Sequence, residues 1–159
     1  MQTPKLAQAF TYTVRVTAPP HFLGVFPDGI RLLFHSPAGE LVGHGEFSGF
    51  RATSLPQAAD VFLIQPDDTG AFEVLASLQT EDGKVFAERH RGRATLPPGT
   101  YQAMLAGKPP SGTASARVLF EFLSGHAEHQ ALCRDVFFRL ASISFDTMTV
   151  HWDIYAAQA

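Results

Sequence analysis

Three arginines, Arg89, Arg91 and Arg117, are the side chains best suited to binding a ligand. Guanidinium groups on facing strands hold a carboxylate, phosphate or phenolate through paired, charge-assisted hydrogen bonds. We therefore interpret the three as candidate substrate-binding residues for an organic anion. The alternative is structural, because arginines at a surface or barrel rim readily pair with carboxylates such as Glu73.

A second group has the chemistry for proton transfer. Asp60 begins a short apolar strand after two alanines, where a buried carboxylate would be costly unless it is paired. Glu121 lies between Phe120 and Phe122, so alternation directs it away from them. Together with Tyr101, these carboxylates are candidate catalytic residues for isomerisation, cyclisation or elimination without a cofactor. The alternative is that they cap turns or pair with arginines.

A third group is His126, His129 and Cys133, on a helix predicted over Gly125–Asp135 with Ser124 placed for an N-cap. Spacings of three and four residues bring all three side chains to one side of a helix, as a metal site requires. The pattern matches no established zinc signature, so we expect a solvated helix and no metal.

The hairpin predicted over Phe72–Arg93 would position the arginines. Asp82-Gly83 is typical of a two-residue type I′ turn, which pairs Thr80 with Val85. That register places Arg89 and Arg91 on the face of Val74, Ala76 and Leu78, and it places Glu88 and His90 on the opposite face with Leu75, Ser77 and Phe86. Charges beside small apolar residues suit a barrel wall whose lumen holds polar groups.

The remaining pattern is also mostly β. Alternation predicts a first strand over Phe10–Thr17 after a loose leader, Met1–Gln8, and a brief strand over Tyr101–Leu105. Strands over Val136–Ser142 and Thr147–Tyr155 form a closing hairpin. The count is nine or ten strands with at most one helix, in a single domain over residues 1–159, which indicates a closed barrel or a sandwich.

Composition narrows the class of function. The 159 residues are 45% hydrophobic and carry a formal net charge of −3, which gives no general field to attract nucleic acid or an anionic membrane. After Gly43 and Gly45 the third glycine of a dinucleotide fingerprint is at the wrong spacing and no helix pattern follows, and we expect no cofactor. One cysteine and no signal-peptide pattern favour a cytoplasmic protein. A homodimer is the assembly favoured by base rates.

Several short motifs run in a familiar order: FTYTVRVT at Phe10–Thr17, Ala59-Asp60, Glu81-Asp82-Gly83, Arg89-His90-Arg91-Gly92, then Arg117, Phe122, Gly125, Leu132 and Arg134. In this order the chain resembles a divergent member of the DUF3237 family, also called UPF0311, of small bacterial and fungal proteins of unassigned function. It departs at Leu123, Ala131 and Cys133, where the family favours an acidic residue, Trp and Asn. The resemblance implies an antiparallel β-barrel with a cavity but brings no catalytic mechanism.

We therefore expect an all-β fold, an antiparallel barrel of about 8–10 strands with one short helix. The favoured function is binding of a small, partly aromatic organic acid, with catalysis as a lyase, isomerase or cyclase left open. The alternatives are a non-catalytic ligand carrier, or a structural or assembly protein with a filled lumen and an exposed apolar patch.

Overall fold

The computed structural model describes residues 5–16, 18–35, 39–56 and 59–158. Its strands are β1 (Lys5–Arg15), β2 (His21–Phe26), β3 (Gly29–His35), β4 (Gly39–Gly43), β5 (Arg51–Ser54), β6 (Ala59–Ile64), β7 (Thr69–Thr80), β8 (Val85–Thr95), β9 (Thr113–Leu123), β10 (Phe137–Ser144) and β11 (Thr149–Gln158). The helical segments are α1 (Thr100–Leu105), α2 (Gln130–Arg134) and two 3₁₀ turns, Gly45–Phe47 and Ala127–His129.

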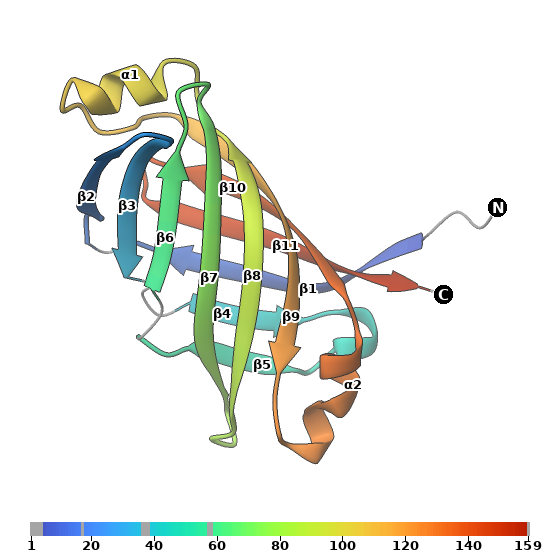
Figure 1. The fold of residues 1–159 in the computed structure, drawn as a ribbon. Coiled ribbons are helices and arrows are strands. Elements are labelled where there is room, and N and C mark those ends of the chain that lie inside the picture. Colours follow the sequence, from blue (N-terminus) through green and yellow to red (C-terminus); the bar gives the residue numbers. More distant parts are fainter. Residues whose placement is uncertain (1–4, 17, 36–38, 57–58, 159) are drawn as a thin grey trace.

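Eight of the strands form a closed antiparallel barrel (Figure 1). Their order is β7-β5-β4-β1-β11-β10-β9-β8, and pairing between β8 and β7 closes the ring. Closure leaves these strands with few free edges. The predicted antiparallel β-barrel is therefore confirmed.

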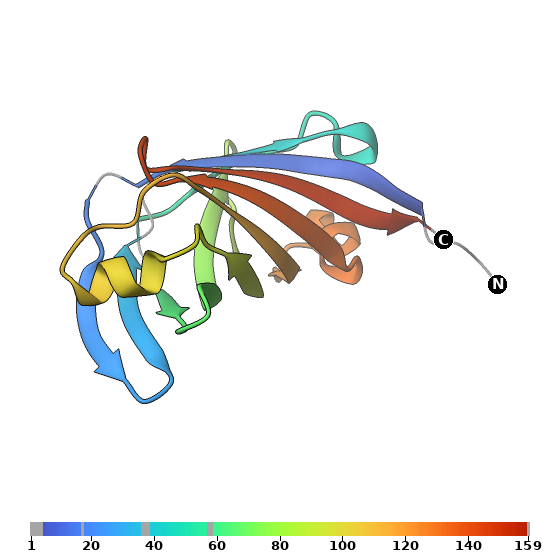
Figure 2. The ribbon, with the colours of Figure 1, turned by 90° about the horizontal axis from the view of Figure 1, so that it is seen from above.

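Three further strands extend the sheet beyond the barrel. The first half of β7 pairs with β6 and its last residues pair with β5, so the sheet divides along this one long strand. β6 then pairs with β3, and β3 with β2, which is the last strand on that side. Figure 2 shows the β2–β3 hairpin projecting from the barrel, with α1 beside it. The extension and α1 thus form one end of the molecule.

The β7–β8 hairpin closes with a three-residue loop, and the predicted two-residue turn is wrong. The Thr80 N–H donates to the Lys84 carbonyl at 3.0 Å, and the Gly83 N–H donates to the Thr80 carbonyl at 2.9 Å. Gly83 has a φ of +87°, the left-handed conformation that follows a type I turn in hairpins of this length. Asp-Gly occurs in both two-residue and three-residue hairpin loops, so this dipeptide alone does not give the length of the loop.

This one-residue difference reverses the two faces of β8. Val74 pairs with His90 and Ala76 pairs with Glu88, so His90 and Glu88 point into the barrel. The predicted inward direction of Arg89 and Arg91 is wrong, because a slip of one residue moves every side chain of a strand to its other face. The lumen therefore holds a different set of polar groups from the one that the sequence predicted.

Three other segments also differ from the predictions. The segment expected to be a brief strand, Tyr101–Leu105, lies in α1, and part of the expected leader, Lys5–Gln8, belongs to β1 and pairs with β11; residues 1–4 lie outside the described residues. The helix expected over Gly125–Asp135 is shorter, a 3₁₀ turn followed by α2. No helix among the described residues is long and apolar enough to cross a bilayer.

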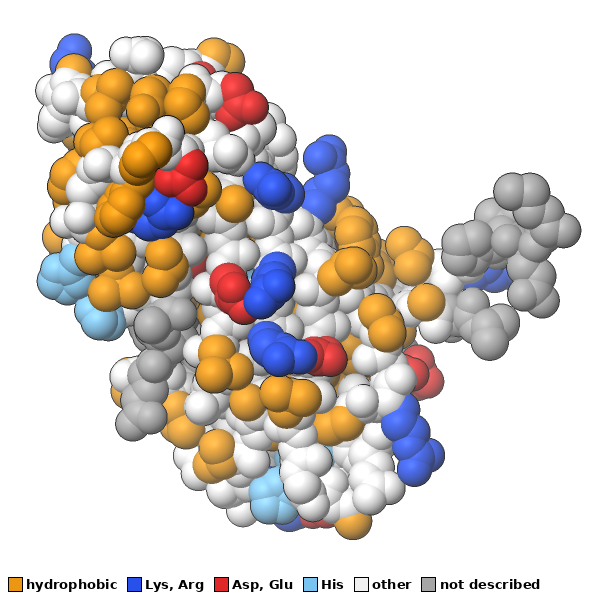
Figure 3. All heavy atoms as spheres, in the orientation of Figure 1, with side chains coloured by type: hydrophobic (Ala, Val, Ile, Leu, Met, Phe, Trp, Pro, Cys, Tyr) orange, Lys and Arg blue, Asp and Glu red, His pale blue; other side chains and the backbone are white. Residues whose placement is uncertain are grey.

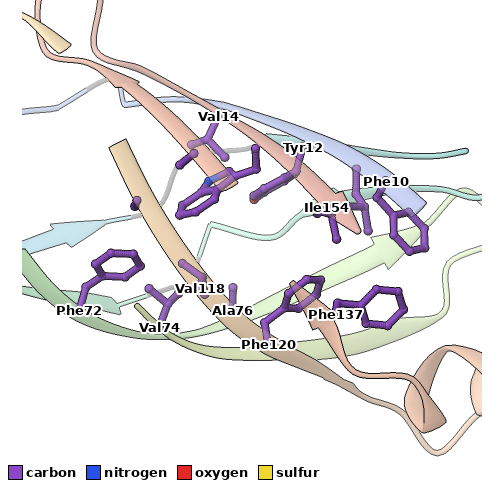
Figure 4. Close-up of a cluster of buried hydrophobic side chains, with 14 of the residues drawn as sticks. Phe10, Tyr12, Val14, Phe72, Val74, Ala76, Val118, Phe120, Phe137 and Ile154 are labelled. Carbon is purple, nitrogen blue, oxygen red and sulfur yellow. The ribbon is translucent and has the colours of Figure 1, made fainter. Parts of the chain in front are cut away.

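The barrel interior is filled at one end and hollow at the other. Phenylalanine rings occupy the end nearest α2, where the centroids of Phe10 and Phe47 lie 4.8 Å apart and those of Phe120 and Phe137 lie 5.2 Å apart. Figure 4 shows side chains of β1 and β11, such as Tyr12, facing those of β7 and β9. The phenylalanine side chains thus fill this end of the barrel, and the space beyond them is open.

A substitution at Gly92 of β8 tests how tightly the barrel wall is packed. A Cβ atom there would lie 2.5 Å from Phe72 Cζ and 2.6 Å from Val118 Cγ2, well inside van der Waals contact. We expect Gly92→Ala to lower the free energy of unfolding by about 1–3 kcal/mol through overpacking. Urea denaturation measures the change. Gly125→Ala, where nothing lies within 4 Å, is the control, and equal effects of the two variants would contradict this account.

Candidate functional site

A cavity of about 800 Å³ occupies the hollow end of the barrel and continues beneath α1. Most of its lining is apolar, including Phe62, Phe72, Val74 and Trp152. The polar side chains in the lining include Tyr12, Asp60, Glu88, His90 and Arg139, with His35 and Lys108 among the exposed residues at its mouth. A volume of this size is typical of small-molecule sites.

Glu88 of β8 and Arg139 of β10 form an ion pair inside the barrel. Arg139 Nη2 donates to Glu88 Oε2 at 2.6 Å, and Nη1 lies 3.4 Å from Oε1. Both side chains are almost fully buried, with 2% and 0% of their surfaces exposed. Burial by itself would raise the pKa of Glu88, but the charge of Arg139 and its hydrogen bond outweigh that effect and hold the pKa below its usual value. The pair therefore stays ionised.

Aromatic rings surround the Arg139 guanidinium. Its Cζ atom lies 4.2 Å from the ring centroid of Phe120, 5.1 Å from that of Trp152 and 5.5 Å from that of Tyr12. Cation–π contacts of this kind stabilise a desolvated guanidinium. Burial, followed by the charge of Glu88, raises the pKa of Tyr12 to about 12, so Tyr12 keeps its proton. The rings and the ion pair fix Arg139 in one position.

His90 lies next to this pair on β8. Its Nδ1 is 3.7 Å from Glu88 Oε1, too far for a hydrogen bond. Burial, reinforced by the positive charge of Arg139, lowers the pKa of His90 to about 4. The imidazole is therefore neutral at physiological pH, with one nitrogen able to donate a proton and the other able to accept one.

Asp60 reaches the cavity from β6. Alternation puts it on the inward face with Phe62 and Ile64, between Phe34 of β3 and Val74 of β7. Burial raises its pKa from 3.8 to about 7. Near neutral pH this carboxyl group is thus divided between its acid and carboxylate forms, which suits a group that gives and takes a proton.

Among the residues that the structure describes, three buried polar atoms in the lining have no hydrogen-bond partner: Asp60 Oδ1, His90 Nδ1 and Arg139 Nε. Buried polar groups in folded proteins are nearly always paired, and an unpaired one costs about 1–3 kcal/mol. All three belong to residues that line the same cavity. The polar groups of a ligand, or water, would satisfy them there.

Helix α1 and the residues after it cover part of the cavity. Asp68, which has a φ of +59°, holds the start of α1: its Oδ2 accepts from the Gly99 N–H at 2.6 Å and its Oδ1 from the Tyr101 N–H at 2.7 Å. Met104, Leu105 and residues 107–110 line the cavity below. Access to the cavity thus depends on the position of this segment.

The sequence-predicted arginines lie on the outer face of the barrel. Arg89 pairs with Glu121, with its Nε 2.9 Å from Oε1, and Arg91 pairs with Glu73 at 2.8 Å. Figure 3 shows basic and acidic side chains side by side across the middle of this face. Arg117 is also exposed there. Of the predicted binding and catalytic residues, only Asp60 lines the cavity.

Two other groups lie elsewhere. Tyr101 packs against the core from α1 and is absent from the cavity lining. The rings of His126 and His129 are 5.4 Å apart, and Ser124 Oγ accepts from the His126 N–H and contacts His129 Nδ1 at 2.9 Å. Across the described part of the chain, no three His, Cys, Asp or Glu side chains lie close enough to hold a metal ion.

Sequence reasoning missed Glu88, His90 and Arg139 as members of the site. The first two would have been found from the correct hairpin loop, since they alternate with Phe86 on the inward face. Arg139 gave no signal, because its neighbours Phe138 and Leu140 on the outward face of β10 are apolar, so the first half of this strand has no clearly polar face. Without a polar face, alternation cannot tell which residues point inward.

A known family model matches this sequence. The family model described as "Protein of unknown function (DUF3237)" matches residues 4–157. The chain belongs to the DUF3237 family. The resemblance of its short motifs is thereby confirmed over nearly the whole chain. No protein of curated function matches this DUF3237 member.

Solved structures share the fold of this DUF3237 chain. A Clostridium acetobutylicum protein of unknown function has a TM-score of 0.81 and 18% identity, with 98% of this chain and 100% of that chain covered. A Rhodopseudomonas palustris protein of unknown function has a TM-score of 0.81 and 23% identity, covering 99% and 100%. An enzyme from Penicillium herquei has a TM-score of 0.68 and 13% identity, covering 99% and 97%. At these identities the likeness shows the fold alone.

Proposed function

We propose that this protein binds a small, largely apolar and partly aromatic organic molecule in the barrel cavity and moves a proton on it without a cofactor. The observation that carries the proposal is the set of three unpartnered buried polar atoms around one apolar cavity. The reaction class is that of a lyase, isomerase or cyclase. An enzyme with the same fold in Penicillium herquei supports the view that this fold admits catalysis.

The polar groups have complementary roles in such a reaction. Asp60, with its pKa near 7, would take or give the proton, and neutral His90 would donate a hydrogen bond to an oxygen of the ligand. Arg139, through its free Nε–H, would donate a hydrogen bond to negative charge that develops there. This hydrogen bond accelerates the reaction only to the extent that it is stronger in the transition state than in the complex with the unreacted ligand.

The charges inside the cavity also bear on the ligand. The charge of Arg139 is balanced by Glu88, and the arginines expected to hold a carboxylate lie on the outer face. A neutral ligand with an acidic C–H or O–H group therefore suits the interior better than a carboxylate. An acid group on the ligand would be placed at the mouth, near Lys108.

Trp152 gives a direct measurement of binding, since it is the one tryptophan in the chain and it lines the cavity. We expect phenols, aromatic ketones and aromatic acids in a screen to include ligands that change its fluorescence and raise the melting temperature. Ala76→Leu narrows the cavity and is expected to weaken binding by about tenfold or more. Ala87→Leu, whose side chain points away from the lumen, is the matched control.

Turnover then separates an enzyme from a carrier. A ligand whose mass, absorbance or hydrogen–deuterium content changes with wild type but not with Asp60→Asn supports catalysis. A ligand that binds and stays unchanged identifies a carrier. No binding across the screen, with Ala76→Leu merely stabilising the fold, would contradict the proposal and assign the cavity a structural role.

A further inference from the structure

Strand β2 is a free edge of the sheet, and a β-bulge between Phe22 and Gly24 is its one protective feature. It is the last strand of the extension, and within the described residues it pairs with β3 alone. Its other edge therefore presents backbone N–H and C=O groups without strand partners. Proteins usually protect such an edge with lysine, proline or inward-pointing charges. The sequence of β2, HFLGVF, contains none of these.

The side chains of β2 are unusually apolar for an exposed strand. The exposed fractions are 57% for Phe22, 47% for Leu23, 57% for Val25 and 41% for Phe26. Leu105 of the adjacent α1 is 46% exposed. We name these five residues the β2 patch. Figure 3 shows hydrophobic side chains gathered over this end of the molecule. A gathering of exposed apolar side chains of this kind marks an interaction surface.

We propose that the β2 patch is a homodimer interface in which β2 of two copies pair antiparallel about a twofold axis. This inference is independent of the proposed function. An edge strand offers its backbone groups as a template on which another strand pairs, and a lipid surface supplies no such strand. A twofold axis makes the strand its own complement, since residue i meets residue j and j meets i.

The groups at the two ends of β2 do not oppose this arrangement. The start of β2 carries His21, whose ring lies 5.1 Å from that of His35, and Asp28 follows the end of β2. Both Asp28 oxygens accept from Arg31 at 2.7 Å. Antiparallel pairing sets the histidine end of one copy beside the aspartate end of the other. The strand itself carries no charge that would repel its copy.

The available area is consistent with a dimer of ordinary size. A stable interface buries about 800 Å² on each partner, and a fully buried aromatic side chain contributes about 150–250 Å². The two half-exposed phenylalanines thus supply roughly a quarter of the area, and the other side chains of the β2 patch and the strand edge add to it. A bulge between Phe22 and Gly24 interrupts the strand, so side-chain burial must contribute most of the affinity.

The dimer would also complete the ligand cavity. Phe22 and Leu105 line the mouth of the cavity and are about half exposed. A second copy on the β2 patch would cover these side chains. Each copy would thereby form part of the rim of the other copy's site.

Light scattering coupled to size-exclusion chromatography tests this proposal across the micromolar range. We expect wild type at the mass of two chains, and Val25→Lys to raise the dimer dissociation constant by more than about tenfold, because it buries a charge at the strand edge. Val25 does not line the cavity. Leu119→Lys on the outer face of β9, where Leu119 is 63% exposed, is the control and is expected to remain dimeric.

Three results would overturn the proposal. The first is a wild-type protein that stays monomeric at every concentration. The second is a dimer that Leu119→Lys dissociates and Val25→Lys does not, which places the interface on the outer barrel face. The third is monomeric wild type that sediments with phosphatidylcholine vesicles, which assigns the patch to a membrane. Slower amide exchange of residues 21–26 at high protein concentration would support pairing through β2.

Discussion

Arg139→Met is expected to lower the free energy of unfolding by about 3–5 kcal/mol at neutral pH, because it leaves the Glu88 carboxylate buried without its partner. Urea denaturation followed by circular dichroism measures the loss. The loss should shrink as the pH falls, since a protonated Glu88 carries no charge. The double variant Glu88→Met with Arg139→Met should recover much of the stability, because two apolar side chains replace two charges.

Strand β8, which carries Glu88, also supplies a matched control. Arg89 forms an ion pair with Glu121 on the outer face, where the two side chains are 57% and 46% exposed. Arg89→Met is expected to cost no more than about 1 kcal/mol, because solvent screens an exposed pair. Equal losses from Arg89→Met and Arg139→Met would contradict the distinction drawn between the two faces of β8.

Asp60→Asn is expected to make the protein more stable at alkaline pH and to slow the proposed proton transfer. The pKa of Asp60 is raised from 3.8 to about 7, so between these values the folded state binds a proton that the unfolded state does not. Wild-type stability therefore falls as the pH rises through this range, by up to about 4 kcal/mol. Asparagine cannot ionise and avoids this loss. The two proteins should have similar stability near pH 4, and the variant should be more stable near pH 8.

The activity of this variant provides the second measurement. Loss of a general acid or base costs about 100-fold or more in rate, so turnover of any substrate found should fall by that factor with little change in binding. Glu121→Gln on the outer face is expected to change neither turnover nor the pH dependence of stability. Wild type and Asp60→Asn with the same dependence of stability on pH would show that the Asp60 carboxyl is solvated.

The sequence predicted the barrel because most strands alternate clearly. Phe10, Tyr12 and Val14 mark the inward face of β1, and Trp152 and Ile154 mark that of β11, as the structure confirms. Turn residues between the strands then indicate their antiparallel order. These features are local, so a single sequence contains them.

The candidate site could not be predicted to the same extent, because it depends on details of register. The loop at Glu81-Asp82-Gly83 has three residues where two were predicted. This extra residue places Glu88 and His90 in the lumen, where Arg89 was expected. Asp60 was found because its position among apolar residues does not depend on that loop. Register errors preserve the fold but reverse the chemistry of a strand.

The pairing of the first strand with the last has a consequence for how the protein folds during synthesis. β1 pairs with β11, so Val14 of the first strand meets Val150 of the last, and contacts this distant in sequence give a high contact order and slow folding. During synthesis on the ribosome, β1 has to wait for β11 before the ring can close. Trp152 of β11 also forms part of the cavity lining. The cavity is therefore completed only when the final strand of the barrel is in place.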